Sequence, residues 1–321
     1  MFGIPPIALW IAAIIAMGLA FIPPMLLLLE KTGRVDDKLR VELWKRYKSW
    51  LVLAPLMVLP LLAGRLWAIL GVGILSLLCY REFARATGLF RHRTISAIVA
   101  LGIILLTFAV ADNWYDFFVA LTSLGVSALV IAALLADEPK GYIQRVGLGV
   151  FAFLLFGVCL GHFGYFANDK RGQAFLLAII FSVELNDIFA YCSGKLFGRR
   201  KLAPQTSPNK TIAGAVGALI LTTALFATLM HFITAGTVID RPIHLITLGV
   251  LVSFTGQCGD LVMSSIKRDL GLKDLGTLLP GHGGLLDRFD SLIFVGPAVF
   301  HYLNYFAGFG FDTPTRIFTG P

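Results

Sequence analysis

Long apolar runs separated by short charged clusters are the feature that most constrains this chain of 321 residues. The chain is 57% hydrophobic and 14% charged, with a mean hydropathy of +0.81, whereas soluble domains carry roughly 25% charged residues. One soluble core cannot bury this much apolar surface, so the bilayer must act as the solvent. Because helices satisfy their backbone hydrogen bonds internally, the sequence predicts an all-α, polytopic integral membrane protein.

The apolar runs predict nine or ten transmembrane helices, since a helix needs roughly 17 to 25 apolar residues to span a bilayer. Two of the runs are short, so they form either two tight helices split by Arg65 or a partly re-entrant pair. The first run has no basic residue before it and no Ala-x-Ala-like cleavage site, so we expect a retained helix rather than a signal peptide. The runs lie at 4–29, 50–64, 66–80, 94–111, 117–136, 146–167, 174–193, 212–235, 244–264 and 291–310.

Basic residues mark one side of the membrane, because 22 of the 27 Lys and Arg residues lie in five alternate connecting segments. The positive-inside rule places these segments in the cytoplasm and both termini outside. The positions of the basic residues explain the net charge of +8 by orientation in the membrane, so we expect no nucleic-acid partner. The first segment is either an interfacial helix or a simple anchor to anionic headgroups. The five segments are 31–48, 81–93, 137–145, 194–211 and 265–288.

Acidic residues inside two apolar runs are the first candidates for chemistry. Glu184 and Asp187 lie within 174–193, and Asp260 lies within 244–264. Ionisable groups within a span are costly and usually face a partner or a water-filled cavity, although each could instead form a structural salt bridge or hydrogen bond. Helical spacing of about 100° per residue predicts two polar stripes, Glu184–Asp187–Tyr191 and Asp260–Ser264–Lys267.

A polar loop at 264–290 combines carboxylates, basic side chains and glycines. Magnesium binds phosphates through one or two carboxylates, and Asp260, Asp287 and Asp290 are among the carboxylates available here. Basic side chains neutralise the remaining phosphate charge, and the Pro280–Gly284 turn offers backbone N–H groups to an anion. The sequence therefore predicts a phosphate-binding site at the membrane surface. The basic residues around it are Lys195, Arg199, Arg200, Lys267, Arg268, Lys273 and Arg288.

The second polar segment, 194–211, is basic and is interrupted by Pro204 and Pro208. We therefore expect a structured loop rather than a helix. It is either a solvated loop that obeys the positive-inside rule, or its Ser207–Thr211 end binds phosphate at the start of the next helix.

Three stretches of the polar loop resemble one known signature. They are Ser-Ser-Ile-Lys-Arg at 264–268, Lys-Asp-Leu-Gly at 273–276 and Leu-Pro-Gly-His-Gly-Gly-Leu-Leu-Asp-Arg-Phe-Asp at 279–290. Together they resemble the signature of the phosphatidate cytidylyltransferases, also called CDP-diacylglycerol synthases. Further similarity covers about 180–295 and includes Gly259-Asp260, Asp187-x-x-Ala190-Tyr191, Gly194-Lys195-Leu196-Phe197-Gly198 and Ser207-Pro208-x-Lys210-Thr211.

The resemblance implies a helical membrane enzyme that joins CTP to phosphatidate and releases pyrophosphate. It implies a homodimer that also contacts membrane lipids, and it implies Mg²⁺ as the cofactor, alone or together with K⁺. The expected location is a bacterial inner (cytoplasmic) membrane, with the active site facing the cytoplasm. We divide the chain into 1–170, a scaffold with the dimer contacts, and 171–321, a catalytic region with cytoplasmic loops 194–211 and 265–288. By position, the catalytic residues are Lys267, Arg268, Asp274, His282, Arg288 and Asp290, the substrate-binding residues are Asp187, Tyr191, Ser207, Lys210, Lys273, Gly283 and Gly284, and the metal ligands are Asp260 and Asp287. His282 could be an acid–base group or could only pack in its loop.

Three positions depart from the family pattern. Ile212-Ala213 stands where the family has Trp-Glu, Met263 where it often has an acid, and Ile188 where it has Thr or Ser. These departures leave open a related CTP-dependent membrane enzyme with another lipid acceptor, such as a polyprenol. A non-catalytic ion-binding membrane protein is a further alternative, but a transporter should show paired interrupted spans in two halves, and the sequence has no such symmetry.

Overall fold

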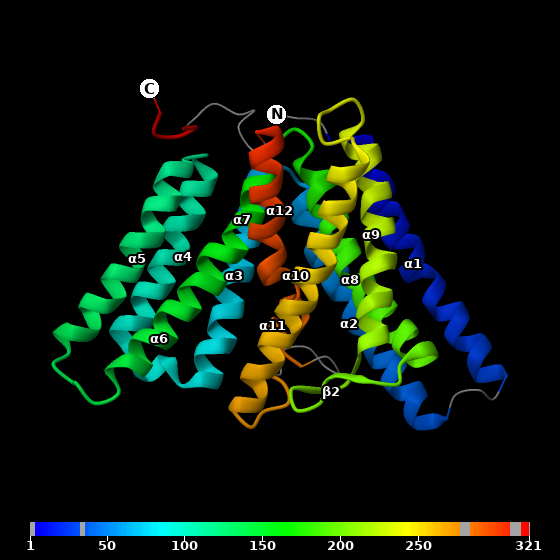
Figure 1. Ribbon diagram of the computed structural model, residues 1–321, viewed down its shortest axis with the longest axis horizontal. Coiled ribbons are helices and arrows are strands. Elements are labelled where there is room, and N and C mark those ends of the chain that lie inside the picture. The colour runs from blue at the N-terminus through cyan, green and yellow to red at the C-terminus, as the bar shows by residue number, and fades with distance from the viewer. Residues whose placement is uncertain (1–3, 33–35, 277–282, 309–315, 321) are drawn as a thin grey trace.

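The computed structural model describes residues 4–32, 36–276, 283–308 and 316–320. Its architecture is a bundle of long helices, as Figure 1 shows, and the predicted all-α membrane fold is confirmed. The helices are α1 (Pro6–Lys31), α2 (Asp37–Leu62), α3 (Arg65–Thr87), η1 (Leu89–Arg91), α4 (Arg93–Ala111), α5 (Tyr115–Leu135), α6 (Tyr142–Ala152), the π-helix η2 (Phe153–Cys159), α7 (Leu160–Phe166), α8 (Gly172–Phe197), α9 (Ile212–Thr234), α10 (Pro242–Asp269), α11 (Leu286–Phe289) and α12 (Leu292–Ala307).

Among the described residues, eight helices are long and apolar enough to cross a membrane, with α6, η2 and α7 counted as one continuous helix, and α12 is a shorter apolar helix. The predicted span at 50–64 is corrected by helix α2, which begins well before it. Its charged first half and apolar second half form one helix from Asp37 to Leu62, because no helix-breaking residue separates them. The short runs on either side of Arg65 are two separate helices, since Gly64 ends the first stretch with a φ of 118°, which glycine adopts freely.

The five basic segments meet at one end of the bundle. In Figure 1 the described parts of the α1–α2, α3–α4, α5–α6, α8–α9 and α10–α11 connections lie at the bottom, while both chain termini lie at the top. We call these the basic end and the terminal end. The structure therefore places the five segments on the same side of the bundle, as the positive-inside rule predicted.

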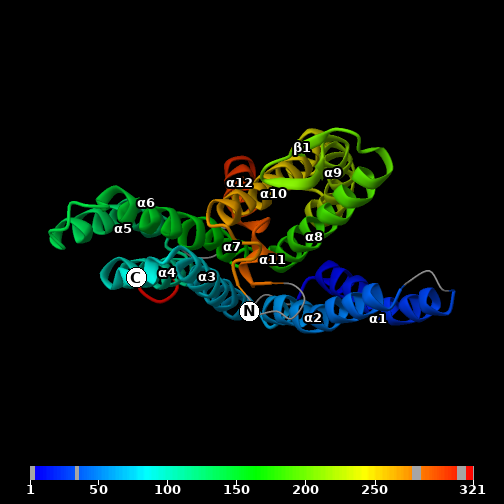
Figure 2. The same cartoon turned by 90° about the horizontal axis from the view of Figure 1, so that it is seen from below.

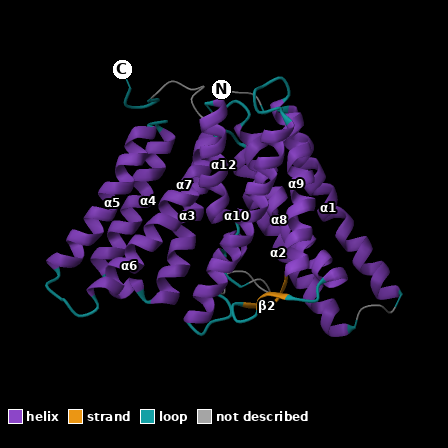
Figure 3. Ribbon diagram, viewed as in Figure 1, coloured by secondary structure: helices purple, strands orange, loops and turns teal. Residues whose placement is uncertain are grey.

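Both polar segments of the C-terminal half have local structure at the basic end. The α8 helix continues to Phe197, and an antiparallel hairpin of β1 (Lys201–Ala203) and β2 (Ser207–Thr211) follows, drawn in orange in Figure 3. The expected structured loop is confirmed in this hairpin. The start predicted for the other loop at residue 265 was wrong, because α10 runs to Asp269. Charge marks where a helix leaves the membrane, whereas the helix ends where its backbone hydrogen bonds end.

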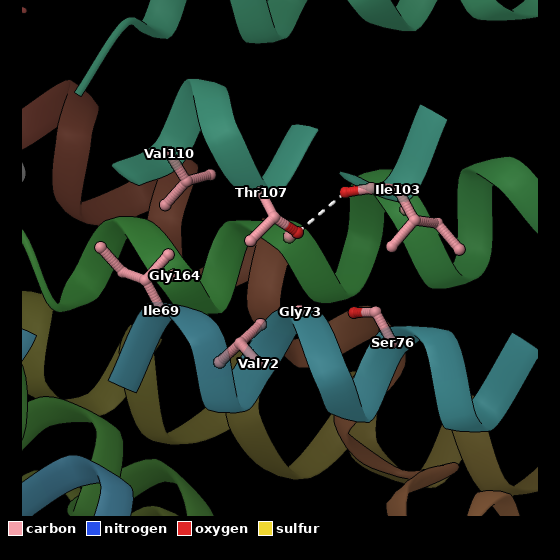
Figure 4. Close-up of a pocket in the computed structure, with 10 residues that line it drawn as sticks. Ile69, Val72, Gly73, Ser76, Ile103, Thr107, Val110 and Gly164 are labelled. Carbon is pink, nitrogen blue, oxygen red and sulfur yellow. Dashed lines mark hydrogen bonds between the residues drawn. The ribbon is translucent and has the colours of Figure 1, made fainter. Parts of the chain in front are cut away.

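A small cavity lies between α3, α4 and the helix formed by η2 and α7, and Figure 4 shows its lining. Its volume of about 10 Å³ could hold at most about one water molecule. Thr107 Oγ1 on its wall donates a hydrogen bond to the Ile103 carbonyl at 2.8 Å. This cavity is too small to receive a substrate, so the site must lie elsewhere.

Candidate active site

The acid predicted on α10 is held from two directions. Ser264, one helical turn after Asp260, donates to Asp260 Oδ1 at 3.1 Å. Lys210 reaches from strand β2 and forms an ion pair with Asp260 Oδ2. The Asp260 side chain keeps 21% of its surface exposed, so it can still receive a ligand. The hairpin and α10, which the sequence treated as separate candidates, therefore share one site.

Lys267 extends the same stripe of α10 and joins the two ends of the signature. Its Nζ lies 3.0 Å from Asp287 Oδ1 and 3.8 Å from Asp290 Oδ2. The side chains of Lys267, Asp287 and Asp290 are 12%, 2% and 9% exposed, respectively. Since charges this well buried persist only when they are paired, Lys267 fixes both aspartates beside α10.

Asp287 also closes the loop that leads to it. Its Oδ2 accepts hydrogen bonds from the backbone N–H groups of Leu275 at 2.9 Å and Gly284 at 2.8 Å. Gly283 has a φ of 80°, and a Cβ added there would lie 3.0 Å from both Asp274 Cβ and Asp287 Oδ2. Glycine is therefore required at this turn by backbone conformation and by space.

Glu82 is a site residue that sequence reasoning missed. It lies on α3, in the part of the chain expected to be scaffold, and it is 7% exposed. Its Oε1 accepts from the Leu285 N–H at 3.0 Å, and its Oε2 accepts from the Leu286 N–H at 2.8 Å. The only signal in the sequence is an acid between Arg81 and Arg85 in a basic segment, and nothing there reveals a partner about two hundred residues away.

The remaining acids complete one electrostatic network. Asp187 on α8 interacts with Asp260, Lys210 and Arg288. Asp290 interacts with Asp260, Asp187, Lys267 and Arg288, and Glu184 interacts with Asp187, Asp290 and Arg288. The network holds carboxylates in excess over cations. The carboxylates are Glu184, Asp187, Asp260, Asp287 and Asp290, and the cations are Lys210, Lys267 and Arg288.

Other predicted site residues lie at the edge of this network. Arg268 donates from Nε to the Thr206 carbonyl of the hairpin at 3.3 Å, Ser207 lies half-buried in β2, and Lys273 and Asp274 are exposed. Tyr191 is 67% exposed, and its ring lies 5.8 Å from Lys195 Nζ. Among the described contacts, none joins Tyr191 to the carboxylates. His282 lies outside the described residues.

The departures from the family pattern have a simple structural setting. Met263 is 1% exposed and packs in the apolar core, where an acid would be costly to bury. Ile188 and Ile212 are exposed, at 54% and 45%. None of these residues belongs to the described ion pairs, so the departures leave the network itself in place.

The donor set fits a divalent cation in its chemistry. No three Asp, Glu, His or Cys side chains of the described residues converge as a ready-made metal cage. Magnesium typically binds through only one or two carboxylates and takes its other ligands from phosphates and water. The excess of carboxyl groups over basic groups and the partial exposure of Asp260 suit such a cation. Asp287 is more fully engaged, because its oxygens accept from Lys267 and two backbone N–H groups.

Comparison with known proteins decides the class of enzyme. The model of the cytidylyltransferase family matches residues 44–306, which contain every contact described above. The chain belongs to the cytidylyltransferase family. It is therefore a nucleotidyltransferase, and the resemblance carried by the signature is confirmed.

Three relatives match this chain over most of their own length. The phosphatidate cytidylyltransferase of Staphylococcus aureus strain COL is 32% identical over 251 residues, covering 77% of this chain and 94% of that protein. The phosphatidate cytidylyltransferase of Bacillus subtilis is 33% identical over 215 residues, covering 64% of this chain and 78% of that protein. The uncharacterised protein YnbB of Escherichia coli K12 is 32% identical over 283 residues, covering 85% of this chain and 91% of that protein.

Proposed function

We propose that this cytidylyltransferase transfers the cytidylyl group of CTP to phosphatidate and releases CDP-diacylglycerol and pyrophosphate. The observation that carries the proposal is the network in which Lys267 joins Asp287 and Asp290 while Lys210 joins Asp260. It combines anion-binding and cation-binding groups at the end of the bundle where the basic segments meet. The relatives that are named phosphatidate cytidylyltransferases support the choice of acceptor.

The chemistry is an in-line displacement at phosphorus. A phosphate oxygen of phosphatidate forms a bond to the α-phosphorus of CTP, the bond from that phosphorus to the β-phosphate oxygen breaks, and the electron pair leaves with pyrophosphate. The attacking oxygen is already anionic near neutral pH, so no strong general base is needed. The protein must instead hold two repelling anions in line and stabilise the charge that grows on the leaving group.

The cations of the network suit this second task. Lys267 and Arg288 would neutralise the leaving pyrophosphate with Arg268 nearby, and Lys210 with Ser207 would hold the nucleotide or the lipid headgroup. Asp260, with Asp287 beside it, would hold Mg²⁺, which supplies charge neutralisation at the phosphate oxygens when bound. Lys210 and Lys267 form ion pairs with these two aspartates. A cation bound by the aspartates would replace the lysines there, and the lysines would then be free to bind phosphate.

Location supports the same substrate pair. The exposed hairpin lies at the basic end, beside the C-terminal ends of α8 and α10, so CTP can arrive from water and phosphatidate can arrive sideways from the leaflet. The positive-inside pattern supports a site on the cytoplasmic side of a bacterial inner membrane. A homodimer, with its contacts in 1–170, remains a prediction that cross-linking in membranes would test.

The test is pyrophosphate release by purified protein with CTP and Mg²⁺. Phosphatidate, a polyprenyl phosphate and no acceptor would be compared at equal surface concentration. We expect release with phosphatidate that depends on both CTP and Mg²⁺. If only the polyprenyl phosphate supported pyrophosphate release, phosphatidate would be rejected as the acceptor. If neither lipid phosphate supported release, the proposed reaction would be rejected.

A further inference from the structure

Glu82 makes an unusual pair of contacts for a buried acid. Its two carboxylate oxygens accept from the N–H groups of two consecutive residues, Leu285 and Leu286, at 3.0 and 2.8 Å. Among the described residues, no salt bridge involves Glu82, and its side chain is buried. Its helix, α3, packs against α11, and Figure 2 shows these two helices side by side. Hydrogen bonds to a carboxylate are strong and expensive to lose when they are buried, so this contact fixes the backbone on either side of it.

Two glycines of the signature are shaped around this carboxylate. A Cβ added to Gly284 would lie 2.4 Å from Glu82 Oε2, and a Cβ added to Gly276 would lie 2.5 Å from Glu82 Oε1. Gly276 and Gly284 also approach each other, since that added Cβ on Gly276 would lie 2.9 Å from Gly284 Cα. Both sides of the polar loop therefore close onto one side chain that comes from the N-terminal half.

The contact is one residue away from the site network. Leu286 directly precedes Asp287, which binds Lys267 and accepts from Gly284 N–H. A shift of the 285–286 backbone would therefore move Asp287. Because Lys267 contacts both Asp287 and Asp290, its distances to the two carboxylates would change as well. Misplacement by about 1 Å at a reacting site can cost roughly 100-fold in rate.

We infer that Glu82 is a positioning residue for nucleotidyl transfer, which anchors the signature loop to α3 and so sets the geometry of Asp287, Lys267 and Asp290. The inference rests on the proposed function of this site. It also assigns Gly284 a different task from the predicted one, because the absence of its side chain makes room for Glu82 whether or not its N–H also faces substrate.

The experiment measures kcat, KM for CTP and melting temperature for Glu82→Gln and Glu82→Ala in the full-length chain. Removing both acceptors in Glu82→Ala should lower kcat by about 100-fold, whereas Glu82→Gln keeps one acceptor oxygen and should lose roughly 10-fold. KM for CTP should change by less than about threefold in both, because the loop still binds nucleotide when it is misaligned. Glu138→Gln is the matched control, since Glu138 is 69% exposed in the α5–α6 connection, and it should behave like wild type.

A double-mutant cycle separates positioning from general destabilisation. Gly284→Ala alone should lower kcat at least 30-fold because its new Cβ collides with Glu82. In the Glu82→Ala background the same change should cost clearly less, since contacting residues are not additive and two of the three closest contacts of the new Cβ are with Glu82, although its contact with Gly276 N at 2.8 Å remains. Fully additive losses, or wild-type kcat in Glu82→Ala, would overturn the inference.

Hydrogen exchange distinguishes the failure of this inference from the failure of the proposed function. Amide exchange of peptides covering 283–290 needs no substrate, and it should speed up in Glu82→Ala and Glu82→Gln but not in Glu138→Gln. Wild-type protein that shows this effect but never turns over phosphatidate would refute the proposed function and leave the anchor standing. Unchanged exchange in the Glu82 variants would refute the anchor.

Discussion

The two ends of the bundle use the same device for different purposes. At the terminal end, Asp112 is fully buried and accepts from the backbone N–H groups of Ile317, Phe318 and Thr319 and from the Thr319 hydroxyl. At the basic end, Glu82 likewise accepts consecutive backbone N–H groups from a distant segment. In both places a buried carboxylate ties a C-terminal segment to the N-terminal helices.

What surrounds the two carboxylates differs. Near Asp112, Arg65 is paired with the Asn168 side chain at 2.7 Å and with the Ala111 carbonyl, and Arg316 stacks 4.0 Å from the Trp114 ring centroid. The described polar groups there satisfy one another. In the network beside Glu82, five carboxyl groups lie near three basic groups. We therefore expect catalysis at the basic end, where carboxyl groups outnumber basic groups, and a structural role at the terminal end, where the polar groups satisfy one another.

The largest contrast should come from removing one charge at each end. Asp260→Asn should lower turnover by about 1,000-fold, which corresponds to roughly 4 kcal/mol of transition-state stabilisation. Asp112→Asn should leave turnover within about twofold of wild type. Initial rates of pyrophosphate release, with melting temperatures measured alongside, check both. Equal losses in the two variants would break the comparison.

A lysine pair gives the next largest effect. Lys267→Met should lower turnover about 100-fold, the cost typical of losing one preorganised charge-stabilising group, because Lys267 is the only described ion-pair partner of Asp287. Lys170→Met, at an exposed position in the α7–α8 turn on the terminal end, is its control and should be silent. Lys267→Arg keeps the charge and should recover part of the rate. A Lys267→Met enzyme with ordinary turnover would remove Lys267 from the mechanism.

Stability should show the reverse order. Asp112→Ala removes the acceptor for the tail at 317–319 and should lower the free energy of unfolding by about 1–2 kcal/mol, with turnover retained. Thermal unfolding in detergent measures the loss, and limited proteolysis should show faster cleavage of the C-terminal segment. A large loss of turnover without loss of stability would mean that the terminal end takes part in catalysis.

The smallest expected effect is on acid stability. Burial disfavours the charged form of Asp112, but its hydrogen bonds from Thr319, Phe318 and Ile317 outweigh this and lower its pKa. Its stabilising contribution is therefore complete above the ordinary aspartate pKa of about 3.9 and is lost as the pH falls toward the lowered folded value. Melting temperatures at pH 5 and pH 3 should fall less in Asp112→Asn than in wild type. An equal fall in the two would contradict the assignment.

Hydropathy and charge predicted much of this fold from the sequence. Apolar runs predicted the spans, and the five basic segments predicted which connections share an end, because both follow from local transfer free energies. The helical stripe of Asp260, Ser264 and Lys267 was also predictable from spacing, and the structure places all three on one face. The continuous helix α2 was missed because its charged half resembles a surface segment.

The long-range contacts of the site were beyond the sequence. Glu82 lies in a basic segment whose composition already has an explanation, and its partners at 285 and 286 are backbone groups that leave no residue-type signal. The pairing of Lys210 with Asp260 is similar, since it depends on how the hairpin folds back over α10. Such contacts are set by tertiary packing, which one sequence does not display.

The most direct test of the central claim follows two labels of CTP. Purified protein would be incubated with phosphatidate, Mg²⁺ and CTP labelled with ³²P at either the α or the γ phosphate, and the lipid phase would be extracted. Cytidylyl transfer predicts that the α label enters the lipid as CDP-diacylglycerol while the γ label stays in water as pyrophosphate. A γ label in the lipid would mean phosphoryl transfer, and no label in the lipid would mean no transfer, and either result would contradict the assignment of this site.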